Sequence, residues 1–253
     1  MSLNEGINAN SSIILSDDMV IIKELVDSAV NLIRDEMNFL KYYNIELEDL
    51  RKRELRCFEN NNGLYKLILS VYASYEFTVK RMFEYVLEII DKEEISISDL
   101  NVNIKALYFK EDLDDLRKKI NPQSQQSNQL IKEEISKKVV RIFSHFEEDN
   151  VFTTKDNMIN TKSNLKIEVL LEIIYYFDIE KSLIMPYDSY IKTLVHHRNN
   201  IAHGNQRFAD SLPQYIMPIN VQNYERLCEA IIKLINELYN HLEVYVNQKK
   251  YLR

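Results

Sequence analysis

Residues 194–204 read Leu194-Val195-His196-His197-Arg198-Asn199-Asn200-Ile201-Ala202-His203-Gly204, and they carry more potential chemistry than any other part of the chain. They include three of the five histidines and one of the three glycines. Apolar residues at helical spacing lead into this run from Pro186, so it is predicted to form the last turns of a helix. Gly204 is predicted to end that helix, because glycine takes the left-handed conformation there without steric cost. His203 would then lie where the helix dipole favours a cation.

The polar residues of this run divide into two groups on a helix with about 100° per residue. Arg198 is in phase with the apolar Leu194 and Ile201, on the side that packs against the protein. A cation on that side needs a partner or a cleft, because burying it unpaired is costly. Arg198 and His203 are about 140° apart on a straight helix. They can act on one substrate only if the helix unwinds before His203 or a second copy supplies its own pair. One polar stripe holds His203 together with His196, Asn199 and Asn200.

The same run resembles the signature of a known superfamily. Arg198 is followed directly by Asn199, and the sequence from Arg198 to Gly204 is similar to the motif of HEPN (higher eukaryotes and prokaryotes nucleotide-binding) domains. It is most similar to the bacterial HEPN nucleases of toxin–antitoxin and phage-defence loci. Residues 72–80, with Tyr85 beyond them, resemble the first core helix of that subgroup, and residues 164–170 resemble the helix that leads to the motif. The resemblance covers about residues 60–245.

This resemblance implies a fold, an activity and partners. The fold would be an all-α, HEPN-like antiparallel helical bundle, and the activity would be that of a metal-independent endoribonuclease without a cofactor. The catalytic residues would be Arg198, Asn199 and His203, and in this superfamily the two motifs of a homodimer face each other across one composite cleft. A toxin or phage-defence effector of this kind would act on RNA and be held by an antitoxin or regulatory protein. The alternative is a non-catalytic HEPN module that binds a nucleotide, RNA or a protein.

The residue types suit cleavage of RNA by its own 2′-hydroxyl, which attacks the adjacent phosphate. This reaction needs proton transfer, and histidine has an intrinsic pKa suited to that role near neutrality, which points to His203. Arg198 offers a fixed fork of donors to the phosphate as negative charge develops. Asn199 is predicted to bond the phosphate or to orient His203. Further substrate contacts are expected from Asn200, His196, Glu76, Lys80 and Arg207.

Several of these residues also have a structural interpretation. Glu76 and Lys80 stand four residues apart in the order that favours a surface ion pair on a helix. If they line the cleft instead, Glu76 is the second choice after His203 as general base. His197 is predicted to lie on the helix surface. No metal site is expected from His196 and His203, because they are two turns apart and no carboxylate shares their stripe.

The composition indicates long helices. The chain has 253 residues, 45% of them hydrophobic, with only three glycines and four prolines. A β-sandwich or barrel needs many more turn residues, so the fold class is predicted to be all-α. One domain is expected over residues 16–253, with a helical extension at 16–60, a HEPN core at 61–250 and irregular insertions. Residues 1–15 are expected to be disordered.

Helical periodicity predicts most elements and two of their contacts. Asn164 is predicted to cap the helix that follows it, and a second apolar stripe with Ile232 and Ile235 in the last helix is predicted to pack against a partner chain. The expected helices are about 16–50, 64–90, 104–109, 113–120, 130–146, 164–176, 186–203 and 220–247.

The charge and the cysteines restrict location and partners. The net charge of −7 provides no global attraction to nucleic acid, so RNA binding must rest on a local patch. The basic cluster at 51–56 is either a solvated helix face or a patch that contacts phosphates. Cys57 and Cys228 are isolated, which favours a reducing compartment. No apolar run is long enough for a membrane span and no signal peptide is recognised, so a cytoplasmic protein without membrane contact is expected.

Overall fold

The computed structural model of the chain describes residues 17–51, 62–120, 128–147, 150–203, 216–217 and 221–253. Within these ranges the extended pairings are two isolated bridges, Ser96 with Val151 and Leu100 with Leu252, so the predicted all-α class is confirmed. In chain order the elements are α1 Asp17–Arg51, α2 Asn62–Lys92, the 3₁₀ helix η2 Ile97–Asp99, α3 Val102–Tyr108, α4 Lys110–Ile120, α5 Asn128–Glu147, α6 Ile167–Tyr176, α7 Lys181–Ile184, the 3₁₀ helix η3 Met185–Tyr187, α8 Asp188–Ala202 and α9 Val221–Asn247.

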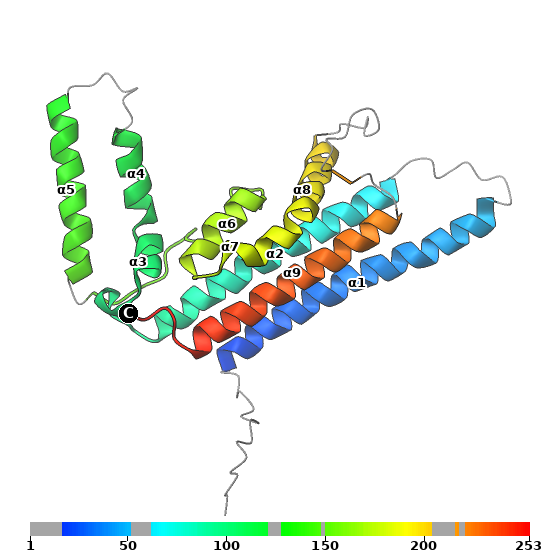
Figure 1. Cartoon of the computed structure of the whole chain (residues 1–253), viewed down its shortest axis with the longest axis horizontal. Helices are drawn as coiled ribbons and strands as arrows, with labels where there is room; N and C mark the ends of the chain where they lie inside the picture. Colours follow the sequence, from blue (N-terminus) through cyan, green and yellow to red (C-terminus); the bar gives the residue numbers. More distant parts are fainter. Residues whose placement is uncertain (1–16, 52–61, 121–127, 148–149, 204–215, 218–220) are drawn as a thin grey trace, which may run out of the picture.

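Three long helices, α1, α2 and α9, lie side by side and form the main body of the molecule (Figure 1). Lys92 at the end of α2 pairs with Asp18 at the start of α1, with 2.6 Å between Nζ and Oδ1. Lys41 late in α1 lies 3.8 Å from Glu225 early in α9. The first helix therefore runs antiparallel to both α2 and α9.

The apolar stripes of these helices meet in one core. In α2 the apolar residues that recur at helical spacing are all buried, namely Leu67, Val71, Tyr75, Val79, Met82 and Val86. The side chains of α1 with the same spacing are buried as well, namely Ile22, Val26, Ala29, Ile33 and Leu40. The apolar stripe of α9 that was predicted to contact a partner chain is also buried in this core, because Ile232 is 9% exposed and Ile235 is 0% exposed. That prediction is wrong, because α9 lies against α1, α2 and α8 and so buries more than one of its faces within its own chain.

The extension and the core predicted from the sequence share this apolar cluster, because α1 packs along both α2 and α9. The boundary assigned at residues 60 and 61 falls outside the described residues. The division of the chain at that point stays a prediction.

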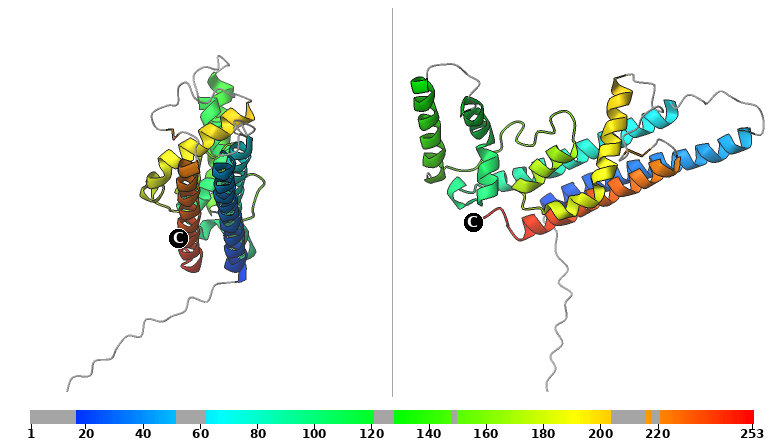
Figure 2. Two further views of the ribbon diagram at one scale, coloured as in Figure 1. Left: turned by 90° about the vertical axis from the view of Figure 1, so that its right-hand side faces the viewer. Right: turned by 45° about the horizontal axis from the view of Figure 1, so that its top comes forward.

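Helices α4 and α5 form a two-helix arm beyond α3, away from the three long helices (Figures 1 and 2). Lys138 joins the two helices through Asp115 at 2.9 Å and Asp112 at 3.8 Å. The apolar residues of α5 are only partly covered, because Ile142 is 6% exposed whereas Phe143 is 65% exposed. None of the helices in the described ranges is long and apolar enough to cross a membrane.

The motif helix α8 packs on α2, α9 and α6. Pro186 lies in the first turn of η3, directly before α8, where its fixed backbone angle suits a helix start. The first half of α8 buries Ile191, Thr193 and Leu194. The second half of α8 carries the motif, and most of its residues are only partly buried.

Candidate functional site

Helix α8 continues without a break through the motif as far as His203. Helix α8 ends at Ala202, and His203 is its C-cap with φ −89° and ψ 4°. The backbone N–H of His203 donates to the carbonyl of Asn199 at 3.0 Å, so the helix does not unwind before His203. The angle of about 140° between Arg198 and His203 therefore persists within one chain. His203 is exposed, while Arg198 is half-buried.

Arg198 is held between a neighbouring amide and an aromatic ring from α2. Its Nη1 donates to Oδ1 of Asn199 at 3.0 Å. Its guanidinium carbon lies 5.0 Å from the centre of the Tyr72 ring, within the range of a cation–π contact. The guanidinium is therefore placed by two contacts that leave most of its N–H donors unused by them.

Asn164 links the motif to α2. Its Nδ2 donates to Oδ1 of Asn199 at 3.1 Å, and its Oδ1 accepts from the Tyr72 hydroxyl at 3.1 Å. The backbone N–H of Leu165 donates to the same hydroxyl at 2.9 Å. The prediction that Asn164 caps a helix is wrong, because α6 begins at Ile167, its N-cap is Lys166, and no side chain caps it. The side chain of Asn164 is instead used in a tertiary contact with α8 and α2.

The environment of Tyr72 keeps its hydroxyl neutral. Burial raises the pKa of Tyr72, the Leu165 N–H and the charge of Arg198 lower it, and the charge of Glu76 and its hydrogen bonding to Tyr72 raise it, so that the pKa is about 12. Glu76 lies one turn further along α2, and its buried Oε1 has no hydrogen-bond partner among the described residues. This buried carboxylate oxygen, one turn from Tyr72, is available to accept a proton.

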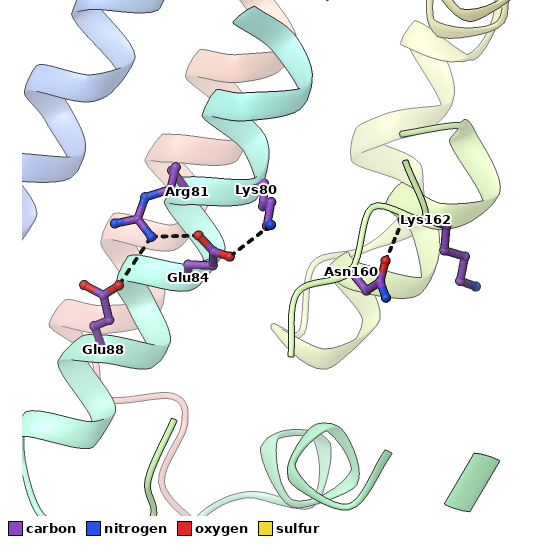
Figure 3. A network of polar contacts seen from close by, with 6 residues as sticks. All are labelled: Lys80, Arg81, Glu84, Glu88, Asn160 and Lys162. Atoms are coloured by element: carbon purple, nitrogen blue, oxygen red, sulfur yellow. Dashed lines mark hydrogen bonds and ion pairs between the residues drawn. The ribbon is translucent and has the colours of Figure 1, made fainter. Parts of the chain in front are cut away.

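Lys80 does not pair with Glu76. Its Nζ lies 3.5 Å from Glu84, one turn further along α2, and Arg81 reaches the same carboxylate at 2.7 Å and Glu88 at 3.4 Å (Figure 3). The predicted Glu76–Lys80 ion pair is therefore wrong. Arg81 at i−3 and Lys80 at i−4 converge on Glu84, so the cations gather around Glu84 and leave Glu76 beside the motif.

His196 and Asn200 form a pair on the outer stripe of α8. Asn200 Nδ2 donates to His196 Nε2 at 2.8 Å. Burial lowers the pKa of His196. With Nε2 accepting, the neutral ring carries its proton on Nδ1, which makes that atom a donor. The structure thus brings together two of the predicted substrate contacts and leaves the Nδ1–H of His196 and the Oδ1 of Asn200 outside this hydrogen bond.

His197 lies inside the protein. It is 2% exposed, and its Nε2 lies 2.7 Å from the carbonyl of Met217, to which it donates. Thr193, one turn earlier, accepts from the Met217 N–H at 3.3 Å. Burial lowers the pKa of His197. The prediction of a surface position is wrong, because α8 is covered on this side by the chain that leads into α9.

Some predicted site residues cannot be placed. Arg207 and Gly204 lie outside the described residues, and so do the side chains of the basic cluster at 51–56. Among the residues that are described, no three histidine, cysteine, aspartate or glutamate side chains lie close enough to hold a metal ion together.

Tyr72 and Asn164 are the site residues that sequence reasoning did not identify. Both belong to runs that resemble the family, but Asn164 also fits a helix cap, and Tyr72 is adjacent to the buried stripe of α2. A buried tyrosine hydroxyl and a half-buried asparagine both require partners. This need for hydrogen-bond partners is the signal that the sequence offers, and it does not identify which residues provide them.

A family model described as HEPN_MAE_28990-like HEPN matches residues 22–251 of the chain. No curated protein and no solved structure gives a significant match. The matched range includes residues 22–51 of α1, and α1 lies within the region assigned from the sequence to an extension. It also includes both Arg198 and the Tyr72–Asn164 connection. The chain therefore belongs to the HEPN_MAE_28990-like HEPN family.

Proposed function

We propose that this protein is an endoribonuclease that cleaves RNA without a metal ion. The observation that carries the proposal is the Arg198–Asn199 pair, held by Tyr72 of α2 and by Asn164 of the segment before α6. One turn from Tyr72 on α2, the buried Oε1 of Glu76 has no hydrogen-bond partner among the described residues. This arrangement supplies fixed donors for a phosphate and a nearby proton acceptor. HEPN domains form a superfamily of nucleases and RNA-binding proteins, which agrees with this chemistry.

In the proposed reaction the 2′-oxygen of a ribose attacks the adjacent phosphorus. A base takes the 2′-hydroxyl proton, the P–O5′ bond breaks, and the leaving 5′-oxygen receives a proton. The products are a 2′,3′-cyclic phosphate and a 5′-hydroxyl end. Arg198 and Asn199 donate to the non-bridging oxygens, whose negative charge grows in the transition state.

We propose His203 as the proton-transfer residue, in a site built from two copies of the chain. His203 and Arg198 leave α8 in directions about 140° apart, so one copy does not aim both at one phosphate. In a symmetric dimer each motif faces the same motif of its partner, and the His203 of one copy reaches the Arg198 of the other. Glu76 is the second choice as base, because it lies on the Arg198 side of the same chain.

The biological setting belongs to the same proposal. A cytoplasmic nuclease of this type would act as a toxin or phage-defence effector and be restrained by an antitoxin or regulatory protein. The net charge of −7 disfavours indiscriminate coating of RNA, so cleavage would depend on the local site. The alternative is a HEPN module that binds RNA, a nucleotide or a protein without cleaving. The exposed position of His203 on the side away from Arg198 favours this alternative if the protein is monomeric.

The decisive experiment is cleavage of total RNA by the purified protein in EDTA, with the fragment ends mapped. Arg198→Ala and His203→Ala are each expected to lower the rate by at least about 100-fold, the usual loss for a key donor or acid–base group. His241→Ala on α9 is the control. Persistent cleavage by His203→Ala would point to Glu76 instead, and absence of cleavage by the wild-type dimer would favour the binding module.

Mixing the two inactive variants tests the shared site. If His203 acts on the partner's phosphate, a heterodimer of Arg198→Ala with His203→Ala contains one complete site. An equal mixture is then expected to recover about a quarter of the wild-type rate, because half of the dimers are mixed and each has one of two sites. A mixture as inactive as its components would show that both residues act within one chain.

A further inference from the structure

We infer that Tyr72 and Asn164 are positioning residues that decide which way the side-chain amide of Asn199 faces. This inference rests on the proposed function and names the chemistry that the Arg198–Asn199 pair accepts. The pair would present only N–H donors, so its ligand is an anion whose oxygens are all acceptors, such as the phosphodiester of RNA.

The first end of the connection is a backbone N–H. Leu165 N can only donate, so the Tyr72 oxygen accepts from it at 2.9 Å. The Tyr72 hydroxyl then donates its own hydrogen bond, and its acceptor at 3.1 Å is Oδ1 of Asn164. With its oxygen used in this way, Asn164 turns its Nδ2 to Asn199.

The other end is the guanidinium of Arg198, which has donors and no acceptor. The Asn199 atom that faces Arg198 at 3.0 Å is therefore the oxygen. This agrees with the direction set from Leu165, since Asn164 also donates to that oxygen. Two donors thus hold Oδ1 of Asn199 inward, and its Nδ2 turns away from both. A phosphate that approaches Arg198 then meets N–H groups from both residues and no carbonyl oxygen.

The protein accepts backbone strain next to Asn164. Lys162 and Ser163 precede it with φ of 54° and 58°, in the left-handed region that is unfavourable for a residue with a Cβ. Figure 3 shows the start of this turn, where Asn160 accepts from the Lys162 N–H at 2.7 Å. Two further backbone bonds, from Asn164 to Thr161 and from Lys166 to Asn164, hold the residue in place. The side chain that meets Asn199 is therefore presented by a rigid turn.

The burial of Tyr72 favours a single direction for the hydrogen bonds that run from Leu165 through Tyr72 to Asn164. Tyr72 is 3% exposed, so its hydroxyl is largely shielded from bulk water and donates to Asn164. Its ring also lies under the guanidinium of Arg198. One side chain therefore sets the place of Arg198 and, through Asn164, the direction of Asn199.

The test is Asn164→Asp, which keeps the shape of the side chain but removes its N–H donor. The carboxylate still accepts from Tyr72, and it repels Oδ1 of Asn199, so the amide of Asn199 turns over and presents its oxygen to the phosphate. We expect kcat to fall by about 100-fold. The matched control is Asn160→Asp, four residues earlier, which adds the same charge and keeps the acceptor for Lys162.

Binding is measured in parallel with an RNA oligonucleotide that carries a 2′-deoxy sugar at the cleavage site and so cannot react. Asn164→Asp is expected to weaken binding at least about 10-fold more than Asn160→Asp. Tyr72→Phe keeps the ring under Arg198, and a fall in kcat of about 10-fold with little change in KM is expected. In an Asn199→Ala background, Asn164→Asp should add nothing beyond the effect of Asn160→Asp.

The outcomes separate the two proposals. If the wild type cleaves and the two aspartate variants behave alike, the positioning role is overturned and the ribonuclease remains. If the wild type binds without cleaving and only Asn164→Asp loses binding, the positioning role stands and the ribonuclease is overturned. Wild-type protein that neither cleaves nor binds the oligonucleotide overturns both.

Discussion

The α1–α2–α9 bundle and the segment from 150 to 166 both support the site, by different means. The bundle uses long helices whose apolar faces repeat at a regular spacing, and its side chains are positioned by burial. The segment lacks helical periodicity, contains left-handed residues that are not glycine, and places Asn164 through hydrogen bonds. The comparison shows that the scaffold tolerates changes that preserve volume, whereas the segment depends on the direction of individual donors and acceptors.

The largest effect on stability is expected in the bundle. Leu238 of α9 is 0% exposed, so Leu238→Ala should lower the free energy of unfolding by about 3 kcal/mol through lost burial and a cavity. Val244→Ala on the same helix, where the side chain is 41% exposed, is the control and should change it by less than about 1 kcal/mol. Urea unfolding measures both. Equal losses would show that α9 is not packed as described.

A smaller effect is expected where the bundle meets the segment. Tyr72→Phe leaves the backbone N–H of Leu165 and the side-chain oxygen Oδ1 of Asn164 without their partner, so the free energy of unfolding should fall by about 2 kcal/mol. Tyr75 provides the matched comparison on the same helix, because its buried hydroxyl has no hydrogen-bond partner among the described residues. Tyr75→Phe should therefore be neutral or slightly stabilising. If Tyr75→Phe proves the more damaging, the hydroxyl of Tyr72 is not the one that joins the two regions.

Acid should weaken the junction at His197. Burial lowers the pKa of His197 below its ordinary value of 6.5. Just below pH 6.5 the histidine is therefore protonated in the unfolded chain but still neutral in the folded protein. Stability should therefore fall as the pH drops below 6.5 towards the lowered folded-state pKa. The His197→Gln variant should lose less stability than wild type between about pH 7.5 and about pH 5.5. An identical loss in both proteins, with His241→Gln as control, would assign the acid sensitivity to other groups.

The smallest effect is expected at the cluster around Glu84. Its ion pairs with Lys80 and Arg81 involve side chains that are 24% to 36% exposed. Partly exposed pairs contribute little, so Glu84→Gln should change the free energy of unfolding by at most about 0.5 kcal/mol. A loss above about 2 kcal/mol would mean that this cluster, rather than the Tyr72 connection, braces the middle of α2.

Most of the scaffold could be predicted from the sequence. The stripe from Leu67 to Val86 and the run of helices follow from periodicity, because one face of each helix must be buried. The motif residues also stand out in the sequence, since Arg198 and His203 belong to one short run. Asn164 could not be assigned in the same way, because an asparagine before a helix is equally suited to a cap and to a distant contact. The predicted Glu76–Lys80 ion pair is absent for a related reason, since Glu84 lies at the same spacing from Lys80 and pairs with it instead.

The sequence by itself determined the fold class, the position of the motif near the end of its helix and the family to which the chain belongs. These properties are local or repetitive, so spacing along the chain is enough to reveal them. Only the tertiary structure decided that His197 lies inside, that Ile232 and Ile235 belong to the chain's own core, and that Tyr72 and Asn164 hold the Arg198–Asn199 pair. These properties depend on which surfaces meet. Tyr72 and Asn164 are 92 residues apart in the chain, and the hydrogen bond between them exists only because the segment before α6 packs against α2.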